Sequence, residues 1–320
     1  MKAVIYKQYG DPSVLQLSDV QVPAPQDGEV LIKVGASGIN PVDTYFRKGI
    51  RPVEKFPHIP HFDVAGEVIE IGTGVTNLRV GDRIWTTNVK GTAAEFICLP
   101  ENLAFHLPEA LSFEEGAALA MPFMTAHLAL HYRANVKSSE TVLIYGGAGS
   151  VGFAAIQIAK QAGATVIATT SNKEKENLAK QAGADEVINY LEADVEEKVN
   201  ILTNGKGVSI ILDMSLSENM EKDFKMISIG GRIVTIGSPI DNTPPLLWRQ
   251  LNMKNASLLG VLLFSAPATE LLKAGQFISD EFKAKSFHAH IGKCFSFGDA
   301  AKAHHALEQK TYNGRIILVP

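Results

Sequence analysis

A run of glycines stands where a nucleotide phosphate could approach the backbone. The apolar segment 141–145 has the character of a buried strand, and it leads directly into Gly147-x-Gly149-x-x-Gly152 and an apolar helix. Gly147 allows a tight turn, Gly149 lets the backbone approach a pyrophosphate, and Gly152 lets the helix pack closely on the strand. The N–H groups at the helix start favour negative charge. The pattern predicts a dinucleotide site; the alternative is a tight glycine turn without a ligand.

The end of the next predicted strand indicates which dinucleotide is bound. NAD enzymes usually place Asp or Glu there to hold the ribose 2′-hydroxyl. After the strand 165–169 this chain has hydroxyls and lysines instead, including Ser171, Lys173 and Lys175. A lysine supplies a positive charge for a 2′-phosphate, and no carboxylate repels it. We therefore expect NADPH, bound through Ser171 and Lys175. The alternative is that both lysines only begin a solvated helix, balanced by the neighbouring glutamates.

Residue types that bind metals are present but badly spaced. Catalytic zinc needs three protein ligands and structural zinc needs four. The two cysteines, Cys98 and Cys294, cannot supply either set, and we expect them to be reduced and mostly buried. His127 and His131 have helical i, i+4 spacing, but no Glu lies between them and their surroundings are apolar. We interpret them, and the pairs His304–His305 and His288–His290, as packing or capping residues.

Composition excludes several classes of protein. The chain has 320 residues, which suits two domains, and a net charge of −4, which predicts no bulk attraction to nucleic acid or to an anionic membrane. No apolar run reaches the roughly 18 residues that a membrane span requires. The first ten residues lack the pattern of a signal peptide. We expect a cytoplasmic enzyme with no membrane and no nucleic-acid partner.

The elements that must position these residues follow from the periodicity. Residues 1–100 carry short Val- and Ile-rich runs between turn residues, which predicts a small antiparallel barrel or sandwich. Residues 112–133 are Ala-rich, and Ser112 and Glu115 have the spacing of a helix capping box. From residue 141 strands and helices alternate. The strands are expected at 141–145, 165–169, 186–189, 208–212, 232–236 and 257–263, and the helices at 150–162, 173–182, 194–203, 218–228 and 245–252.

Six strands with helical connections predict an α/β fold with a doubly wound parallel sheet of the Rossmann type. Gly163 and Gly183 stand where helix C-caps belong. Two further helices, at about 268–282 and 298–309, and a strand at 314–319 follow. Because the Rossmann unit begins so late, both chain ends are expected to join in one other domain. The predicted boundaries give 1–123 with 266–320, and 124–265 for the cofactor-binding domain.

Several motifs resemble the medium-chain dehydrogenase/reductase superfamily, and within it the zinc-free quinone oxidoreductase group that includes zeta-crystallin. They extend over the whole chain: 38–43 (GINPVD), 63–68 (DVAGEV), 80–83 (VGDR), 145–152, 183–190 (GADEVINY), 260–264 (GVLLF) and 314–320. The resemblance implies that the domain built from both chain ends is a GroES-like β-barrel catalytic domain, with the Rossmann domain inserted. It implies an NADPH-dependent reductase of quinones or α,β-unsaturated carbonyls. The alternatives are an enoyl or alkenal reductase of the same fold, or an NADPH-binding protein with little turnover.

The resemblance also implies which residues act on the substrate. Zinc-dependent relatives have a cysteine at the position of Asn40 and a zinc-binding histidine at that of Phe62, so no zinc is expected. Asn40 could instead donate a hydrogen bond to the developing oxyanion. Tyr45 could donate a proton or stack on a ring, and Asp43 is a third catalytic candidate. A turn or capping role for Asp43 after Pro41 is the alternative.

Further cofactor contacts come from matched positions. Thr125 matches a threonine near the nicotinamide ribose, Tyr190 matches a tyrosine near the adenosine, and Ser150 could add a hydroxyl to the pyrophosphate contacts. The expected cofactor set is completed by Val151, Gly237 and Phe264. The chain departs from bacterial relatives at Arg51, where they often have a tyrosine, and at His61 and Ser150, where they have glycine.

The last predicted strand of the parallel sheet indicates an assembly. Residues 256–263 (ASLLGVLL) are apolar on both faces and carry no lysine or proline that would block pairing. As the sixth strand it should lie at the sheet edge, where the same strand of a second copy could pair antiparallel across a two-fold axis. We therefore expect a homodimer.

Overall fold

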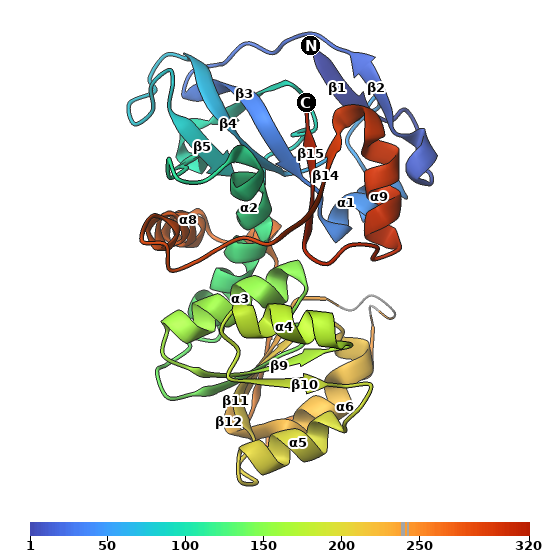
Figure 1. Ribbon diagram of the computed structural model, residues 1–320, viewed down its shortest axis with the longest axis vertical. Coiled ribbons are helices and arrows are strands. Elements are labelled where there is room, and N and C mark those ends of the chain that lie inside the picture. Colours follow the sequence, from blue (N-terminus) through green and yellow to red (C-terminus); the bar gives the residue numbers. More distant parts are fainter. Residues whose placement is uncertain (238–240, 242) are drawn as a thin grey trace. The chain divides into compact units, whose positions relative to one another are not determined.

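The computed structural model describes residues 1–237, 241 and 243–320 (Figure 1). These residues form two compact units, each with its own core. The first comprises Met1–Met121 with Gly275–Pro320, and the second Pro122–Ala274. The boundaries expected from the sequence, 123/124 and 265/266, lie near these, and the later one falls before helix α8 (Ala268–Lys283) rather than within it.

The first unit is built around a largely antiparallel sheet, in which only β14 and β15 pair in parallel among the described strands, and the sheet contains segments from both ends of the chain. Its seven strands run in the order β14-β15-β3-β4-β5-β7, with β6 also paired to β3, and β1 and β2 form a separate hairpin. The strands are β1 (Lys2–Ile5), β2 (Gln16–Asp19), β3 (Glu29–Gly38), β4 (Asp63–Ile71), β5 (Arg83–Thr86), β6 (Phe96–Pro100), β7 (Phe105–His106), β14 (Ile291–Ser296) and β15 (Arg315–Val319). The final strand pairs with β3, so residues near 317 lie beside residues near 38.

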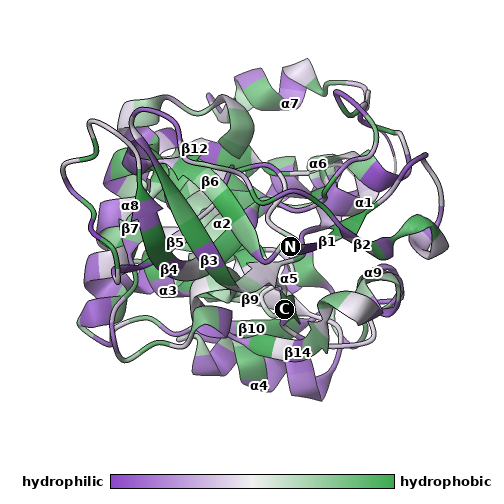
Figure 2. Ribbon diagram, turned by 90° about the horizontal axis from the view of Figure 1, so that it is seen from above, coloured by the Kyte–Doolittle hydropathy of each residue, from purple (hydrophilic) through white to green (hydrophobic). Residues whose placement is uncertain are grey.

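Two short helices complete this unit, α1 (Pro41–Arg47) and α9 (Ala300–Glu308). The sequence analysis predicted no helix at 41–47 and no strand at 291–296. Pro41 fits the first turn of α1 because it needs no hydrogen-bond acceptor there. The core is aliphatic, with Val30, Ile32 and Val68 fully buried. In Figure 2 the strands β3 and β4 accordingly carry green hydrophobic residues, interrupted by purple polar ones.

The second unit is a parallel sheet in the order β10-β9-β8-β11-β12-β13, the arrangement of the Rossmann fold. Helices α3 and α4 cover one face of the sheet, and α5 and α6 cover the other (Figure 1). The strands are β8 (Thr141–Ile144), β9 (Thr165–Thr170), β10 (Glu186–Asn189), β11 (Val208–Asp213), β12 (Ile227–Thr235) and β13 (Ser257–Gly260). The helices are α3 (Ser150–Gln161), α4 (Lys173–Gln181), α5 (Val195–Leu202), α6 (Leu216–Met226) and α7 (Trp248–Met253).

The predicted local signals of this unit are confirmed. Gly163 and Gly183 have φ values of 80° and 103°, the left-handed conformation of a helix C-cap. β13 lies at the sheet edge, as expected, although it ends at Gly260 and so is shorter than the predicted strand. β12 begins five residues earlier than predicted, at Ile227, and includes Gly230 and Gly231, which hid the strand in the sequence.

Helix α2 (Phe113–His127) begins in the first unit and ends in the second. Its start is the predicted capping box: Ser112 N–H donates to Glu115 Oε2 at 2.7 Å, and Glu115 N–H donates to Ser112 Oγ at 3.2 Å. The chain then widens into a π-helix, Leu128–Arg133, where one uniform helix was expected. None of the helices in the described part of the chain is long and apolar enough to cross a membrane.

The cysteine prediction was partly wrong. Both thiols are free, as expected, but Cys294 is exposed on β14 and Cys98 is only half-buried on β6. β14 is mostly half-buried or exposed along its length, and no pattern in the sequence predicted this strand.

Candidate functional site

The glycine turn of the second unit has the shape that a dinucleotide phosphate requires. Gly146 has a φ of 63°, which allows the chain to reverse directly after β8. A Cβ atom on Gly152 would lie 2.2 Å from the Gly146 carbonyl oxygen, and one on Gly147 would lie 2.8 Å from the Ala168 side chain. Only glycine fits these two positions, so α3 begins close against β8 and β9.

The N-terminus of α3 presents free donors at this turn. The first helical hydrogen bond runs from Phe153 N–H to the Gly149 carbonyl at 2.8 Å. The N–H groups of Ser150, Val151 and Gly152 therefore have no acceptor within the helix. Such groups, together with the helix dipole, are suited to a pyrophosphate.

The end of β9 lies beside the same turn. Gly147 N–H donates to the Thr169 carbonyl at 2.9 Å, and Gly146 N–H donates to Thr169 Oγ1 at 3.2 Å. The hydroxyl of Thr170 is buried and makes no hydrogen bond with any residue that the structure describes. A buried polar atom without a partner at this edge fits a site that a polar ligand completes. The sequence analysis did not select Thr170, because a threonine at a strand end carries no distinctive pattern.

The predicted 2′-phosphate residues lie at the start of α4. Lys175 Nζ donates to Ser171 Oγ at 3.1 Å, and no carboxylate pairs with Lys175 among the described residues. Lys173, by contrast, forms an ion pair with Glu176 at 3.0 Å and is largely exposed. Tyr190 follows β10, and its N–H donates to the Thr170 carbonyl, so it belongs to the same edge.

A hollow of about 440 Å³ opens at the carboxyl ends of β11, β12 and β13. Gly237 from the predicted cofactor set lines it, together with Leu216, Thr235 and Leu262. Ligands of doubly wound folds bind at this end of the sheet. Thr125 is buried within α2, and Phe264 lies in a short 3₁₀ turn after β13. All eleven predicted cofactor residues thus belong to the second unit.

The three predicted catalytic residues lie together at the start of α1 in the first unit. Asn40 is the N-cap residue, Asp43 is in the first turn, and Tyr45 follows on the same helix. Asp43 Oδ2 accepts the Asn40 backbone N–H at 2.6 Å, which is the capping contact that the sequence analysis gave as an alternative. Burial raises the pKa of Asp43 well above its usual value, and its Oδ1 makes no hydrogen bond.

The Asn40 side chain is held by a buried ion pair. Its Nδ2 donates to Asp63 Oδ2 at 2.8 Å, and its Oδ1 accepts from Arg315 Nη1 at 2.8 Å. Asp63 and Arg315 are themselves 2.7 Å apart, and both are almost completely buried. Burial raises the pKa of Asp63, although the Arg315 charge acts in the opposite direction. Sequence reasoning did not find this pair, because its members are separated by 252 residues.

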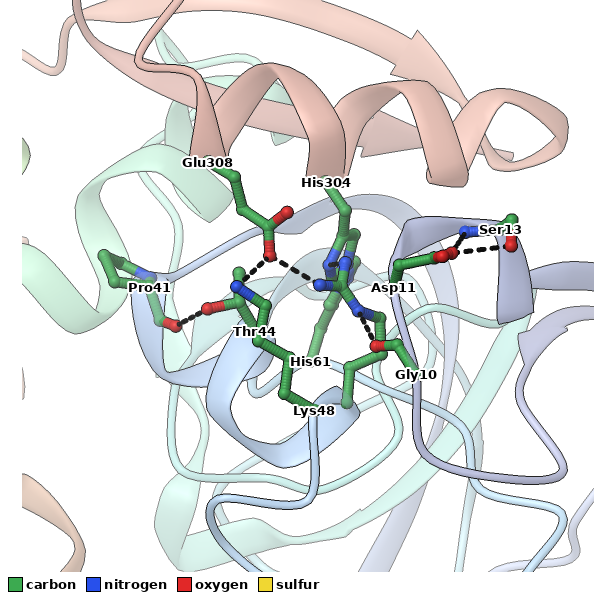
Figure 3. Close-up of polar contacts among 10 residues, drawn as sticks. Gly10, Asp11, Ser13, Pro41, Thr44, Lys48, His61, His304 and Glu308 are labelled. Atoms are coloured by element: carbon green, nitrogen blue, oxygen red, sulfur yellow. Dashed lines mark hydrogen bonds and ion pairs between the residues drawn. The ribbon is translucent and has the colours of Figure 1, made fainter.

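Figure 3 shows a second buried polar chain of the first unit, which joins α9 to α1. Glu308 and His304 point from α9 toward α1, and His61 meets His304 with its Nε2 2.9 Å from the Nε2 of His304. Arg47 Nη1 lies 3.4 Å from His304 Nδ1, and Arg47 Nη2 donates to Glu308 at 2.5 Å. Lys48 also pairs with Glu308, at 2.9 Å.

Arg47 determines which histidine nitrogens carry a proton in this buried polar chain. Because Arg47 can only donate, His304 Nδ1 accepts and His304 Nε2 carries the proton toward His61. His61 then donates from Nδ1 to Ser37 Oγ at 3.1 Å, and Ser37 lies 3.0 Å from Thr92 Oγ1. His61 has a φ of 76°, the left-handed conformation that favours glycine. His304 was expected to pack in the core and does so, whereas its neighbour His305 is exposed.

His127 and His131 also pack together, with ring centroids 4.7 Å apart. Burial lowers the pKa of His127 to about 3. Within the described residues, no three His, Cys, Asp or Glu side chains lie close enough together to hold a metal ion. Phe62, at the position of the zinc-binding histidine, is buried, and its ring centroid lies 5.4 Å from that of Phe46.

Models of known protein families match both the barrel part and the parallel-sheet part of the chain. The family described as the alcohol dehydrogenase GroES-like domain matches residues 26–109, and that described as zinc-binding dehydrogenase matches residues 150–280. A quinone oxidoreductase of Sus scrofa is 36% identical, covering 100% of this chain and 98% of the relative. A 2-haloacrylate reductase of Burkholderia sp. is 30% identical, covering 100% and 99%. A mycobacterial structure complexed with NADPH superimposes with a TM-score of 0.91 at 32% identity, covering 100% of each chain.

The chain belongs to the medium-chain dehydrogenase/reductase superfamily, with a GroES-like domain and a Rossmann domain. Within the superfamily it falls in the zinc-free quinone oxidoreductase group. It is an NADPH-dependent oxidoreductase. NADPH brings the transferable hydride, and the glycine turn and the donors of α3 fit its pyrophosphate.

We predict that acid destabilises the protein through the buried histidines. Burial lowers the pKa of His304 to about 3, and lowers that of His61 as well. In the unfolded protein the histidines take up protons near their ordinary pKa of 6.5, whereas the buried His304 does so only near 3. The free energy of unfolding is therefore highest above pH 6.5 and decreases as the pH falls from 6.5 toward 3. His304→Ala should lower the unfolding free energy at neutral pH by about 1–3 kcal/mol, because Arg47 loses its acceptor.

Urea unfolding of wild type and variants between pH 7.5 and roughly pH 4.5 tests this prediction. The stability of His304→Ala should depend less steeply on pH than that of wild type, and His305→Ala is the matched exposed control on the same helix. Equal slopes for the two variants would contradict the role of His304.

Proposed function

We propose that this enzyme transfers a hydride from NADPH to quinones or α,β-unsaturated carbonyls without zinc. The observation that carries the proposal is the replacement of two zinc-ligand positions by Asn40 and Phe62, an amide held in a buried network and a packed aromatic ring. Neither residue is a zinc ligand. A substrate that is already electrophilic needs no metal, only orientation, a proton and stabilisation of the developing oxyanion.

The residues of α1 suit the remaining tasks. The oxygen of Asn40 and one of its two amide hydrogens are already bound, so the direction of its second N–H is fixed in advance. A fixed donor stabilises an oxyanion without reorganising. Burial raises the pKa of Asp43, which favours its protonated form, and Tyr45 carries a phenolic hydroxyl on the same helix. Either can supply the proton that follows the hydride.

A second candidate function is the reduction of enals, enoyl groups or related activated alkenes. Arg51 stands where bacterial quinone reductases often have a tyrosine, which removes an aromatic surface for a flat ring. The name of the related 2-haloacrylate reductase also indicates an activated alkene as its substrate. A protein that binds NADPH with little turnover is the third candidate.

A panel of substrates separates the three candidates. We expect NADPH oxidation with a benzoquinone or an enone, no oxidation of simple alcohols with NADP⁺, and no loss of rate with a chelator. Turnover only with the enone would select the second candidate. Tight NADPH binding without turnover on the whole panel would select the third.

We propose that the pyrophosphate binds at Gly147, Gly149, Ser150, Val151 and Gly152. Ser171 and Lys175 then bind the 2′-phosphate, and Tyr190 lies at the adenosine end. The hollow lined by Gly237 is suited to the nicotinamide half, for which Thr125 and Phe264 are further candidates. The lone hydrogen bond between Lys175 and Ser171 supports this arrangement, since the ammonium group has capacity for further acceptors.

Lys175→Ala should weaken NADPH binding by about 1.5–3 kcal/mol, the range for hydrogen bonds to charged groups, and leave NADH binding nearly unchanged. Lys173→Ala is the matched control, because Lys173 is paired with Glu176 and should change both affinities little. Titration of protein fluorescence with each coenzyme measures the effect. Equal losses of NADPH and NADH affinity in Lys175→Ala would argue against the phosphate contact.

Asn40→Ala should lower kcat and kcat/KM together, by about ten- to a thousand-fold, with NADPH affinity preserved. The competing role is structural, because Asn40 also bridges Asp63 and Arg315. In that case the melting temperature should fall and the activity should follow the folded fraction. Measuring both on one preparation decides between them, and a stable variant with normal turnover would remove Asn40 from the catalytic residues.

We further propose a cytoplasmic homodimer. Two free cysteines suit a reducing compartment. Strand β13 at the sheet edge pairs only with β12 among the described residues, and Leu262 and Met253 nearby are exposed. An apolar edge of this kind favours pairing with the same strand of a second copy.

Light scattering at micromolar concentration should give the mass of a dimer for wild type and of a monomer for Leu259→Lys. Lysine at an edge strand blocks pairing because its charge would be buried. Leu191→Lys, near the opposite edge strand β10, should leave the dimer intact. A monomeric wild type would contradict the proposal.

A further inference from the structure

Two buried carboxyl groups of the second unit take no part in the proposed coenzyme contacts. Asp213 is the last residue of β11, and Asp223 lies on α6; both are completely buried. The hydroxyl of Tyr145 donates to Asp223 Oδ1 at 2.9 Å. Tyr145 directly precedes Gly146, so the acidic pair is linked to the start of the glycine turn.

The hydrogen-bond donors around the pair are unequally divided. Asp213 Oδ1 accepts from Ser215 N–H at 2.7 Å and from Asn219 Nδ2 at 2.9 Å. Among the described residues, Asp223 Oδ1 accepts only from Tyr145. The second oxygen of each carboxyl group is buried and receives no hydrogen bond from a described N–H or O–H group.

No positive charge compensates the pair among the described residues. Neither aspartate forms an ion pair with a described residue, and the further charge that acts on Asp213, that of Glu218, is negative. The basic residues of the surrounding elements are occupied or exposed: Lys225 pairs with Glu196 and Glu221, Arg232 pairs with Glu140, and Lys222 is exposed on α6. Two adjacent buried charges without a counter-ion are strongly unfavourable, so one carboxyl group must keep its proton.

The electrostatics agree with the donor geometry. Burial and the charge of Asp213 raise the pKa of Asp223 to about 9. Burial also raises the pKa of Asp213, but its hydrogen bonds from Asn219 and Ser215 act in the opposite direction. A hydroxyl on Asp223 Oδ2 would supply the donor that Asp213 Oδ2 lacks.

We propose that Asp223 is a protonated carboxylic acid that shares its proton with Asp213 and acts as a positioning residue for the two loops that receive NADPH. One loop follows Tyr145, whose N–H donates to the Leu212 carbonyl next to Asp213. The other follows Asp213, whose carbonyl accepts from Ile236 N–H, while Leu216 N–H donates to the Gly237 carbonyl in the wall of the hollow. The shared proton would therefore join the end of β11 to α6 and, through Tyr145, to the loop that follows β8.

The arrangement has a consequence for coenzyme binding. Loss of the shared proton leaves two negative charges next to loops that receive anionic phosphates. NADPH should then bind more weakly as the pH rises through the titration of the pair, and binding at that pH should draw one proton from solvent. This consequence rests on the proposed placement of the coenzyme, whereas the protonation of Asp223 does not.

Infrared spectroscopy of the free enzyme at pH 7 tests the protonation directly. The difference spectrum of wild type minus Asp223→Asn should contain the C=O stretch of one buried protonated carboxyl group, because other buried carboxyl groups such as Asp43 cancel in the difference. Wild type minus Glu221→Gln, an exposed control on the same helix, should lack this band. Absence of the band from the Asp223→Asn difference spectrum would overturn the proposal.

NADPH affinity between about pH 7 and pH 10 tests the positioning role. Asp223→Asn keeps a donor toward Asp213 but cannot ionise, so it should match wild type at pH 7 and lack the decrease, on the order of tenfold, expected of wild type at high pH. Asp223→Ala should bind weakly at every pH. If Asp223→Asn and wild type show the same pH profile, Asp223 does not control the coenzyme loops, whatever the infrared result.

Discussion

The ion pair between Asp63 and Arg315 is the contact on which the first unit depends. It joins the first residue of β4 to the first residue of β15, and it holds Asn40 at the start of α1. Charges as deeply buried as these are tolerated only when each has its partner and its remaining hydrogen bonds. Removing either member would leave the other charged and buried, so the geometry of α1 requires the end of the chain as well as the beginning.

Much of the second unit could be predicted because its signals are local. The glycines of the turn after β8, the C-cap glycines 163 and 183, and the alternation of strands and helices each depend on residues close together in sequence. The boundaries that failed are those where local signals conflict with tertiary packing. β12 continues through Gly230 and Gly231, and the helix after Phe113 widens into a π-helix at Leu128.

The candidate site of the first unit was predicted less completely. Residues such as Asn40 and Asp43 were selected from the family resemblance, but their partners were not. Arg315 contacts Asn40, and His304 contacts His61, only because β15 and α9 return to this site from the other end of the chain. Hydrogen bonds that span more than 200 residues leave no periodic pattern, so neither buried network was visible in the sequence. The same reason hides β14, which is recognisable only by its pairing with β15.

The position of β15 has a consequence for how the protein is made. The Rossmann unit is complete in the emerging chain by residue 274, whereas β3 must wait for residues 315–319 before its edge is covered. Until then the nascent chain contains a complete Rossmann unit and an incomplete barrel, in which the carboxylate of Asp63 lacks its partner Arg315. Biosynthesis therefore passes through a stage in which one half is native and the other exposes an open, apolar strand edge, the state that chaperones protect.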